Sequence, residues 1–340
     1  MDRDRPITVT LGIIAYNEEE YLPALLEDVR RQTYPHKQIE VILADSGSDD
    51  RTKAVMEAFR KENKTDFLRI DLLDNPERIQ AAGWNKVIRA ATCDVVIRVD
   101  AHSTIREDFV EKNIDCIGSG EYVCGGHVCF LTDNHSPYGR MLLDAETSSF
   151  GSGPAEYRHD SDGKKRVRSV FNAAYRREIF ERVGLFNEEL VRTEDNELHW
   201  RITSAGYRIC FDPEIHSGHY IRGSLKDMLR QKYLNGYWIG RTLYICPGCI
   251  SAFHLVPLLF VISLLAGMAM AASGLPLLIS VIMMTYGAAM AANALWCIVR
   301  MHNIADVLLP VVCLMIHISY GIGTAAGLLA GGWRKCTAKT

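Results

Sequence analysis

The sequence predicts an α/β domain with a mainly parallel central sheet, followed by a C-terminal helical transmembrane region. From Ile7 to Phe130, short β-branched runs alternate with stretches of helical periodicity. This alternation is typical of a parallel sheet that helices cover on both faces. Between Arg241 and Arg300 the chain has no Asp, Glu, Lys or Arg, which is the composition of segments that cross a bilayer.

The hydrophobic pattern places the first four strands and the three helices between them. In the first helix, the apolar side chains from Tyr21 to Val29 fall on one face. The expected strands and helices, in chain order, are Ile7–Ala15, Glu19–Gln32, Ile39–Ala44, Thr52–Glu62, Phe67–Leu73, Ile79–Ala91 and Val95–Val99.

The sequence is less regular after a strand-like run at Tyr122–Phe130. The stretch Gly151–Lys165 is polar, glycine-rich and without periodicity, so it predicts a mobile loop that can close over a ligand. A strand at Phe171–Tyr175 and a helix at Arg177–Val183 are expected next. Thr193 then opens a helix that ends at a glycine, Gly206.

The C-terminal third has the length and composition of a membrane region. The segment Leu225–Tyr244 is amphipathic and rich in Arg, Lys, Tyr and Trp, as expected for a helix in the headgroup layer. Three apolar runs follow, and each meets the roughly 20 residues that a span requires. These runs are Phe253–Ala272, Leu275–Val299 and Val307–Leu329.

The positive charges give a conflicting topology for the third run. Basic residues before the first run and Arg300 after the second both favour the cytoplasmic side, and the Ser273-Gly274 turn is uncharged. Three spans would then put the tail outside. That tail carries Arg334, Lys335 and Lys339, so either it is an exception or the third segment does not cross fully.

Charge and cysteine content narrow the class of protein. The formal charge is -3 and no long basic run occurs, which excludes electrostatic capture of nucleic acid. Met1–Pro6 leads into the first strand without an apolar signal-peptide core, so a cytoplasmic N-terminal domain is expected. The ten cysteines are scattered, as in a reducing compartment. Cys246 and Cys249 lack the second pair that a zinc site needs.

Polar side chains follow three of the predicted strands. In parallel sheets, ligands bind beyond the carboxyl ends of the strands. The first strand ends in Ala15-Tyr16-Asn17-Glu18, the second in Asp45-Ser46-Gly47-Ser48-Asp49-Asp50, and the fourth in Asp100-Ala101-His102. We expect these three segments to converge on one edge of the sheet.

Asp100 and His102 are candidate metal ligands, because residues two apart in an extended strand share a face. A diphosphate with Mg²⁺ or Mn²⁺ would complete such a shell, and the ion would offset charge on a leaving nucleoside diphosphate. The alternative is a solvated carboxylate and imidazole in a strand-end loop. Asp45 is free to accept from a nucleobase or ribose, whereas Asp49 or Asp50 is expected to cap the next helix.

Glu194 and Asp195 stand at the start of a helix, where the helix dipole stabilises a carboxylate. Helix capping is one interpretation of the pair. The other is general-base chemistry, in which one carboxylate takes the proton of an attacking hydroxyl. We assign that base to Asp195, and Glu194 then holds the acceptor or orients its neighbour.

Together, these motifs resemble the family-two inverting glycosyltransferases of the GT-A fold, from Ile7 to about Arg241. Val99–Ser103 and the segment from Arg222 to Trp238 are similar to those of membrane-bound, succinoglycan-type exopolysaccharide glucosyltransferases. The resemblance implies catalytic residues Asp195 and Glu194 and metal ligands Asp100 and His102. It implies nucleotide binding by Ala15, Tyr16, Asn17, Glu18, Asp45, Ser46, Asp49 and Arg78.

The resemblance also implies the reaction. A UDP-sugar would donate a hexose, with glucose as first choice, to a polyprenyl-diphosphate-linked saccharide, with inversion at the anomeric carbon. The family's usual Asp-x-Asp motif has His102 in its last position here. Imidazole favours Mn²⁺ over Mg²⁺, and the change leaves room for His216 or His219 to approach the metal.

Three residues near the membrane are candidates for gripping the diphosphate or acceptor, namely Arg222, Gln231 and Trp238. Arg suits phosphate because its guanidinium is a planar fork. Interfacial anchoring explains the same residues equally well. Other proteins of polysaccharide assembly are a further expected class of partner.

Several other functions compete. A processive polysaccharide synthase would carry more spans and a Gln-x-x-Arg-Trp motif, whereas Gln231 is followed by Lys-Tyr-Leu-Asn. A polyprenyl-phosphate glycosyltransferase differs only in its acceptor. A non-catalytic nucleotide-sugar-binding scaffold would lack the base or the metal pair. A transporter is disfavoured because the spans carry no charged residue to line a path.

The predicted organisation places a cytoplasmic GT-A catalytic domain at 1–222 and an amphipathic interfacial segment at 223–250. A transmembrane region of about three helices follows at 251–331, with a basic tail at 332–340. The expected location is the inner, or cytoplasmic, membrane, with several spans and the catalytic domain in the cytoplasm.

Overall fold

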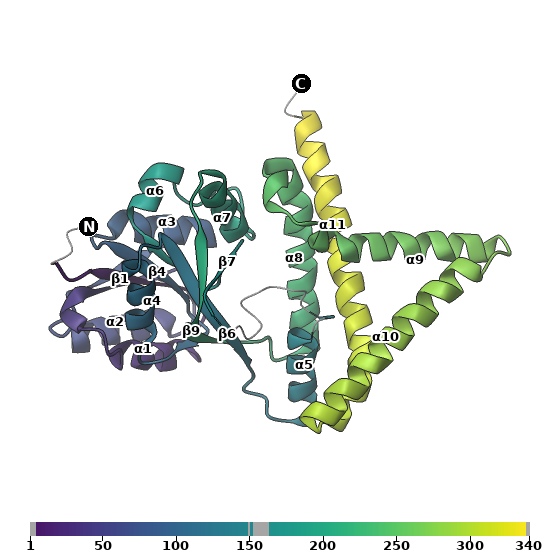
Figure 1. The fold of residues 1–340 in the computed structure, drawn as a ribbon, viewed down its shortest axis with the longest axis horizontal. Coiled ribbons are helices and arrows are strands. Elements are labelled where there is room, and N and C mark those ends of the chain that lie inside the picture. The colour runs from purple at the N-terminus through teal and green to yellow at the C-terminus, as the bar shows by residue number, and fades with distance from the viewer. Residues whose placement is uncertain (1–4, 149, 152–162, 338–340) are drawn as a thin grey trace. The chain divides into compact units, whose positions relative to one another are not determined.

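The computed structural model describes residues 5–148, 150–151 and 163–337. The chain divides into two compact units. The first comprises Met1–Cys129 and Glu156–His219, and the second comprises Phe130–Ala155 and Tyr220–Thr340. Most of the loop predicted at 151–165 lies outside the described residues. Figure 1 labels the elements of both units.

The first unit contains four parallel strands in the order β3-β2-β1-β4. Their register pairs Ala15 with Asp45 and Ile14 with Asp100. The carboxyl ends that carry the polar motifs therefore converge on one edge, as the sequence predicts. The strands are β1 (Val9–Ala15), β2 (Ile39–Asp45), β3 (Arg69–Asp74) and β4 (Val95–Asp100), and the helices between them are α1 (Leu22–Arg30), α2 (Thr52–Asn63) and α3 (Gln80–Ala90).

Antiparallel strands extend the sheet beyond β4 in the order β8-β6-β9-β5, and β7 also pairs with β9. The longest of these strands, β9, was not predicted from the sequence, because a proline, Pro213, and a glycine, Gly218, interrupt its alternation of apolar and polar residues. The added strands are β5 (Ser103–Ile105), β6 (Val123–Leu131), β7 (Lys165–Val167), β8 (Ala174–Arg176) and β9 (Ile209–Tyr220).

Helices cover both faces of this sheet. One apolar core packs α1, α2 and α4 (Phe109–Gly118) against it, through residues such as Leu25, Phe59 and Phe109. The other core packs α3, α6 (Glu178–Val183) and α7 (Glu194–Ser204), and its largest buried side chain is Trp84. These helices fix the loops at the carboxyl edge. The mixed sheet and its two helical layers are those of a GT-A domain.

The second unit is helical. Its long helices are α5 (Pro137–Thr147), α8 (Leu225–Ile245), α9 (Val256–Ala272), α10 (Leu277–Met301) and α11 (Leu309–Thr337), and its short 3₁₀ turns are η3 (Pro247–Cys249), η4 (Ala252–Leu255) and η5 (Ile304–Leu308). Within this unit, α8 and α11 run side by side, and α9 and α10 form a hairpin (Figure 1). Helix α5 was not predicted from the sequence, and its Met141 and Leu142 pack with residues of α8, α10 and α11 in one core.

Glycines allow α8 and α11 to approach at backbone distance. A Cβ atom added to Gly236 of α8 would lie 2.0 Å from the carbonyl oxygen of Tyr320, and one added to Gly327 of α11 would lie 2.0 Å from that of Tyr237. Small residues permit such packing between membrane helices. The glycines of the third apolar run therefore form a helix-packing surface in one continuous helix.

Three segments are long and apolar enough to cross a membrane, which supports a membrane protein. They are Ala252–Ala272, Leu277–Met301 and Ile304–Gly332. They agree with the predicted apolar runs to within a few residues. The first two are almost entirely exposed within the unit, whereas the third has 39% of its most apolar window buried.

Candidate active site

The loops that follow β1 and β2 are bound to each other. Asn17 has a left-handed backbone, with φ of 54°, and its Nδ2 donates to Oδ1 of Asp49 at 2.5 Å. The Asp49 backbone N–H donates back to Asn17 Oδ1 at 3.0 Å. Asp49 therefore shapes the loop at which nucleotide binding was predicted, and its carboxylate is already engaged by Asn17.

Asp50 lies just before Arg51, the N-cap residue of α2, and its carboxylate accepts backbone N–H groups from two segments. One carboxylate oxygen accepts the Thr52 backbone N–H at 2.9 Å, at the start of α2, and the other accepts that of Glu19 at 3.1 Å. Desolvation opposes ionisation of Asp50, but the hydrogen bonds from Thr52 and Glu19 outweigh it and lower the pKa of this carboxyl. Neither aspartate occupies the N-cap position of α2, but Asp50 rather than Asp49 accepts a backbone N–H at the start of this helix.

Arg78 lies across the loop after β2. Its Nη2 donates to the Gly47 carbonyl oxygen at 2.8 Å, and its guanidinium lies 5.2 Å from the centre of the Tyr16 ring. Gly47 has a φ of +72°, and a Cβ there would press on the Arg78 side chain at 3.2 Å. The structure thus brings Arg78, Tyr16 and the Asp45 loop together.

Asp45 is almost fully buried at the end of β2. Its carboxylate accepts the Ser48 backbone N–H at 3.2 and 3.4 Å, which leaves further acceptor capacity. A pocket of about 160 Å³ opens beside Asp45, towards Lys53, Glu57 and Asp74. Ligand pockets are usually about 300 Å³ or more, so this one is too small for a whole nucleotide sugar.

The carboxylate of Glu18 contacts His102 of the candidate metal pair. His102 Nδ1 lies 3.0 Å from Oε1 of Glu18. An ionised carboxylate can only accept, so Nδ1 donates this hydrogen bond, and in the neutral imidazole Nε2 would then keep its lone pair. Carboxylates orient metal-binding histidines in this way. Among the described residues, no group of three or more His, Cys, Asp or Glu side chains is arranged to hold a metal.

His219, rather than His216, lies beside the metal pair. The rings of His102 and His219 have their centres 4.6 Å apart, because β5 and β9 pair Ser103 with His219. The His216 ring instead packs against His127 at 5.7 Å. Of these two histidines, His219 is therefore the one whose ring contacts His102.

Arg98 links the metal pair to the acidic pair of α7, and the sequence analysis missed it. Its Nη2 lies 3.9 Å from Asp100 Oδ1, and its Nη1 lies 3.7 Å from Glu194 Oε1. The guanidinium is buried over the rings of Trp84 and Phe186, 5.0 and 5.7 Å from their centres. A lone Arg in the apolar run of β4 was the available signal, because a buried charge requires partners.

Glu194 is buried, and its surroundings disfavour ionisation of its carboxyl. Burial raises its pKa to about 8, and repulsion from Asp195 adds to the rise, while Arg98 opposes it. At neutral pH the Glu194 carboxyl is therefore largely protonated. The neighbouring Asp195 is half-buried and accepts the Asn196 backbone N–H at 2.8 Å. Because Glu194 faces Arg98, the geometry favours its orienting role over acceptor binding.

The residue before this pair has an unusual backbone. Thr193 adopts a left-handed conformation with φ of 69°, which is uncommon for a β-branched residue. Further along α7, His199 is buried between Ser169 Oγ and the Tyr175 hydroxyl, each 2.8 Å from a ring nitrogen. Desolvation lowers the pKa of His199 to about 4. The neutral imidazole thus fixes the helix through two hydrogen bonds.

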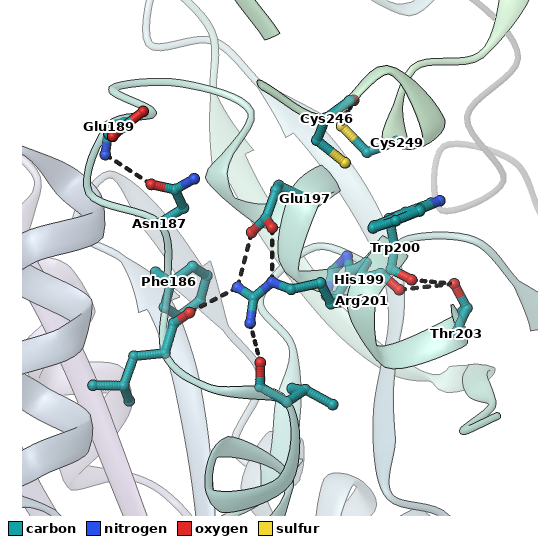
Figure 2. Close-up of polar contacts among 12 residues, drawn as sticks. Phe186, Asn187, Glu189, Glu197, His199, Trp200, Arg201, Thr203, Cys246 and Cys249 are labelled. Carbon is teal, nitrogen blue, oxygen red and sulfur yellow. Dashed lines mark hydrogen bonds and ion pairs between the residues drawn. The ribbon is translucent and has the colours of Figure 1, made fainter. Parts of the chain in front are cut away.

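The loop between α6 and α7 is clamped to α7. Arg201 makes a bidentate ion pair with Glu197 at 2.7 and 2.8 Å. The same guanidinium donates to the carbonyl oxygens of Val183 and Leu185 (Figure 2). These contacts hold the segment that carries Phe186 against Arg98. The start of α7 is therefore positioned from both sides.

The three acceptor candidates belong to the second unit. Arg222 is exposed, and Gln231 and Trp238 are half-buried on or before α8. The Arg241 guanidinium lies 5.5 Å from the centre of the Trp238 ring. This stacking fits the interfacial-anchor interpretation as well as acceptor binding. The Cys249 thiol donates to the Cys246 carbonyl oxygen at 3.1 Å, within a short turn after α8.

Comparison with known proteins identifies the class. Residues 10–184 match the model for Glycosyl transferase family 2, which covers more than half of the chain. The chain therefore belongs to glycosyltransferase family 2. Its fold is similar to that of a mannosyltransferase from Pyrobaculum calidifontis, solved with GDP-Man and Mn²⁺, at a TM-score of 0.63 and 20% identity, covering 96% of this chain and 88% of that one.

Two curated relatives are similar in sequence. Succinoglycan biosynthesis protein ExoA of Rhizobium meliloti (strain 1021) is 31% identical over 230 residues, 66% of this chain and 66% of that protein. The chain thus spans about two thirds of that relative. A dolichyl N-acetyl-alpha-D-glucosaminyl phosphate 3-beta-D-2,3-diacetamido-2,3-dideoxy-beta-D-glucuronosyltransferase of Methanococcus voltae is 24% identical over 329 residues, 95% of this chain and 98% of that protein.

Proposed function

We propose that this protein transfers a hexose, with glucose as first choice, from a UDP-sugar to a polyprenyl-diphosphate-linked saccharide, with inversion at the anomeric carbon. The observation that carries the proposal is the line of groups from His102 and Asp100 through Arg98 to Glu194 and Asp195. It joins a candidate metal site to a candidate base across the carboxyl edge of one sheet. The product would enter cell-surface polysaccharide.

Asp195 would act as the general base. It is half-buried and lies in the first turn of α7, where the helix dipole favours a negative charge. Its carboxylate would take the proton of the acceptor hydroxyl as that oxygen attacks the anomeric carbon. The bond from that carbon to the diphosphate oxygen breaks, and UDP leaves with the electron pair. Attack from the opposite side inverts the centre.

The residues at the end of β4 fit a divalent ion, Mn²⁺ or Mg²⁺. The carboxylate of Asp100 and Nε2 of His102 are suitable donors, and Glu18 fixes the tautomer that leaves Nε2 unprotonated. Such an ion, when bound, stabilises the charge on a leaving diphosphate. Arg78 and Tyr16 border the Asp45 loop, where the nucleoside would bind.

The relatives support a lipid-linked acceptor. The relative matched over nearly the whole chain is named for transfer to a dolichyl-phosphate-linked sugar, and another is named for succinoglycan biosynthesis. Three apolar helices in the second unit fit an acceptor that resides in a bilayer. A cytoplasmic catalytic domain on the inner membrane, with Arg222, Gln231 and Trp238 near the lipid, completes this proposal.

The first test is transfer of labelled sugar into solvent-extractable lipid. Membranes with wild-type protein, Asp195→Asn or the exposed control Asp66→Asn would be given UDP- and GDP-sugars, with Mn²⁺ or a chelator. The proposal expects UDP-dependent label that chelator and Asp195→Asn abolish and that Asp66→Asn retains. Transfer to polyprenyl phosphate alone would favour the second acceptor class. Nucleotide binding without transfer from any donor would favour a scaffold.

A further inference from the structure

The internal geometry of the second unit does not let all three candidate spans cross a bilayer together. Gly321 lies near the middle of the Ile304–Gly332 segment. A Cβ added to Gly321 would lie 2.4 Å from the carbonyl oxygen of Pro257 and 2.6 Å from Cγ2 of Val261. The first turns of α9 therefore touch the middle of α11, and α9 then leads away from it (Figure 1).

This contact has a consequence for α9. If α11 spanned the bilayer, its middle would lie at the membrane midplane, and α9 would begin there. A helix that starts at the midplane reaches at most one surface, so α9 could not span. The 21-residue segment that contains α9 is the most apolar of the three, with a mean hydropathy of 2.4. The segment whose composition best suits the bilayer interior would then be unable to cross the bilayer.

The other end of the hairpin also rests on α11. Ala294 and Cys297, near the end of α10, pack in one core with Leu309 and Val312 at the start of α11. The two helices of the hairpin pack on each other further out, where a Cβ added to Gly267 would touch Ile279. The hairpin therefore has its base on α11. Both of its helices can cross when α11 lies along one membrane surface.

The charges of α8 support the same arrangement, because α8 accompanies α11 in parallel. Ser319 Oγ donates to the Leu229 carbonyl oxygen at 2.9 Å, and Gly331 meets the ring of Tyr244. A spanning α11 would thus carry α8 through the hydrocarbon. Each charged residue at the midplane costs about 2.5–3.5 kcal/mol by insertion scales. The charged residues of α8 are Lys226, Asp227, Arg230, Lys232 and Arg241.

The exposed surfaces of α11 and of the two hairpin helices, α9 and α10, support the same arrangement. The large exposed apolar residues of the third segment recur at intervals of three, four and seven, which places them on one face. They are Ile304, Val307, Leu308, Val311, Met315, Ile322 and Leu329. One apolar stripe is typical of a helix in the interface. By contrast, only 6% of the most apolar window of the segment containing α9 and 11% of that of α10 are buried, as expected for lipid-embedded spans.

We propose that only α9 and α10 cross the bilayer, and that α11 lies with α8 in the headgroup layer with its apolar stripe against the hydrocarbon. The surface that covers this apolar stripe is thus that of the lipid bilayer. This arrangement removes the conflict in the positive-inside pattern, because the end of α11 then lies on the same side as Arg300 and the basic residues of α8. Those residues of α8 are Lys226, Arg230, Lys232 and Arg241.

A protease-site experiment tests the topology in the full chain. A specific cleavage site is inserted either in the Ser273-Gly274 turn or after Lys339, and sealed vesicles of known orientation are treated with the protease. With two spans, the tail site is cut in vesicles that expose the N-terminal domain. The turn site is cut only in vesicles of the opposite orientation. The proposal would be overturned if the tail site and the turn site were cut in the same vesicles, whether or not those vesicles exposed the N-terminal domain.

A depth measurement tests α11 without insertions. Spin labels at Val311, Ile322 and Leu329, which are all exposed, report depth through relaxation by oxygen and by a water-soluble nickel complex. An in-plane helix predicts equal depths at the three positions, whereas labels at Leu259 and Leu265 of α9 serve as the graded control. A maximum at Ile322 between two shallow positions would show that α11 spans and would refute the proposal.

Discussion

Nη1 of Arg98 lies 3.7 Å from Oε1 of Glu194, and this contact couples the end of β4 to the start of α7. The same guanidinium lies 3.9 Å from Asp100. Neither distance is that of a hydrogen bond, so the coupling is electrostatic and acts through a buried, low-dielectric region. One fixed positive charge therefore sets the potential at both the candidate metal ligand and the candidate base.

Replacing Arg98 by Lys tests this coupling. Lysine keeps the charge but lacks the planar fork that reaches two carboxylates while stacked on Trp84. We expect Arg98→Lys to lower kcat by about 10-fold or more, with a smaller change in KM, because the loss falls on the transition state. Steady-state transfer of labelled sugar would measure both constants.

Arg69→Lys is the matched control for Arg98→Lys. Arg69 also pairs with a buried carboxylate, Glu40, at 2.5 Å, but it lies on β3 and touches none of the candidate site residues in the described contacts. Both variants should lower the melting temperature. If their kcat values fell equally, or if Arg98→Lys kept full kcat, the role of Arg98 would be structural only.

The pKa of Glu194 predicts a pH-dependent stability. Its folded-state value of about 8 exceeds the ordinary value of 4.5, so unfolding releases a proton between these pH values. The contribution of this group to stability is therefore fully present below about pH 4.5, and it declines as pH rises towards 8. Each pKa unit corresponds to about 1.4 kcal/mol, so the effect across the window exceeds about 1 kcal/mol.

Glu194→Gln removes this titration and keeps the neutral shape of the side chain. The melting temperature of the wild type should fall more than that of Glu194→Gln when the pH is raised from about 5 to about 8. Other groups titrate in both proteins and cancel in the comparison. The variant should also keep measurable transfer at neutral pH, unlike Asp195→Asn. Equal pH slopes in the two proteins would contradict a protonated Glu194.

The parallel half of the sheet and its polar edge were predictable because local periodicity encodes them. The strand ends at Ala15, Asp45 and Asp100 fall in register, as the topology rule requires. The role of Arg98 was not predictable, because its partner Glu194 lies 96 positions away, on another element. Similarly, β9 pairs with β5 and β7 through long-range contacts, and no local pattern records such pairing.

His102 should set the preference for the metal. His102→Asp converts the motif to two carboxylates, which are harder ligands, so the ratio of Mn²⁺-supported to Mg²⁺-supported transfer should fall several-fold. Glu18→Ala removes the carboxylate that orients the ring and should weaken Mn²⁺ activation by about 10-fold or more. Titration of each ion in chelator-treated membranes would measure both effects, and the exposed Glu20→Ala is the control.

Two outcomes would contradict this account of His102. If His102→Ala kept the metal response of the wild type, the imidazole would not be a ligand. If Glu18→Ala and Glu20→Ala behaved alike, the 3.0 Å contact between Glu18 and His102 would not tune the site.

The close packing of α8 against α11 should be disrupted by a side chain at Gly236 or Gly327. Gly236→Ala and Gly327→Ala each place a Cβ about 2.0 Å from a backbone carbonyl oxygen of the other helix, so the helices must move apart. Overpacking of this kind costs about 1–3 kcal/mol.

Gly287→Ala in α10 is the matched control, because its Cβ would meet no atom within 4 Å. Thermal denaturation in detergent should show a lower melting temperature for the first two variants and an unchanged or slightly higher one for Gly287→Ala, since alanine favours helix over glycine. If all three variants melted alike, the close approach of α8 and α11 would not contribute to the stability of the second unit.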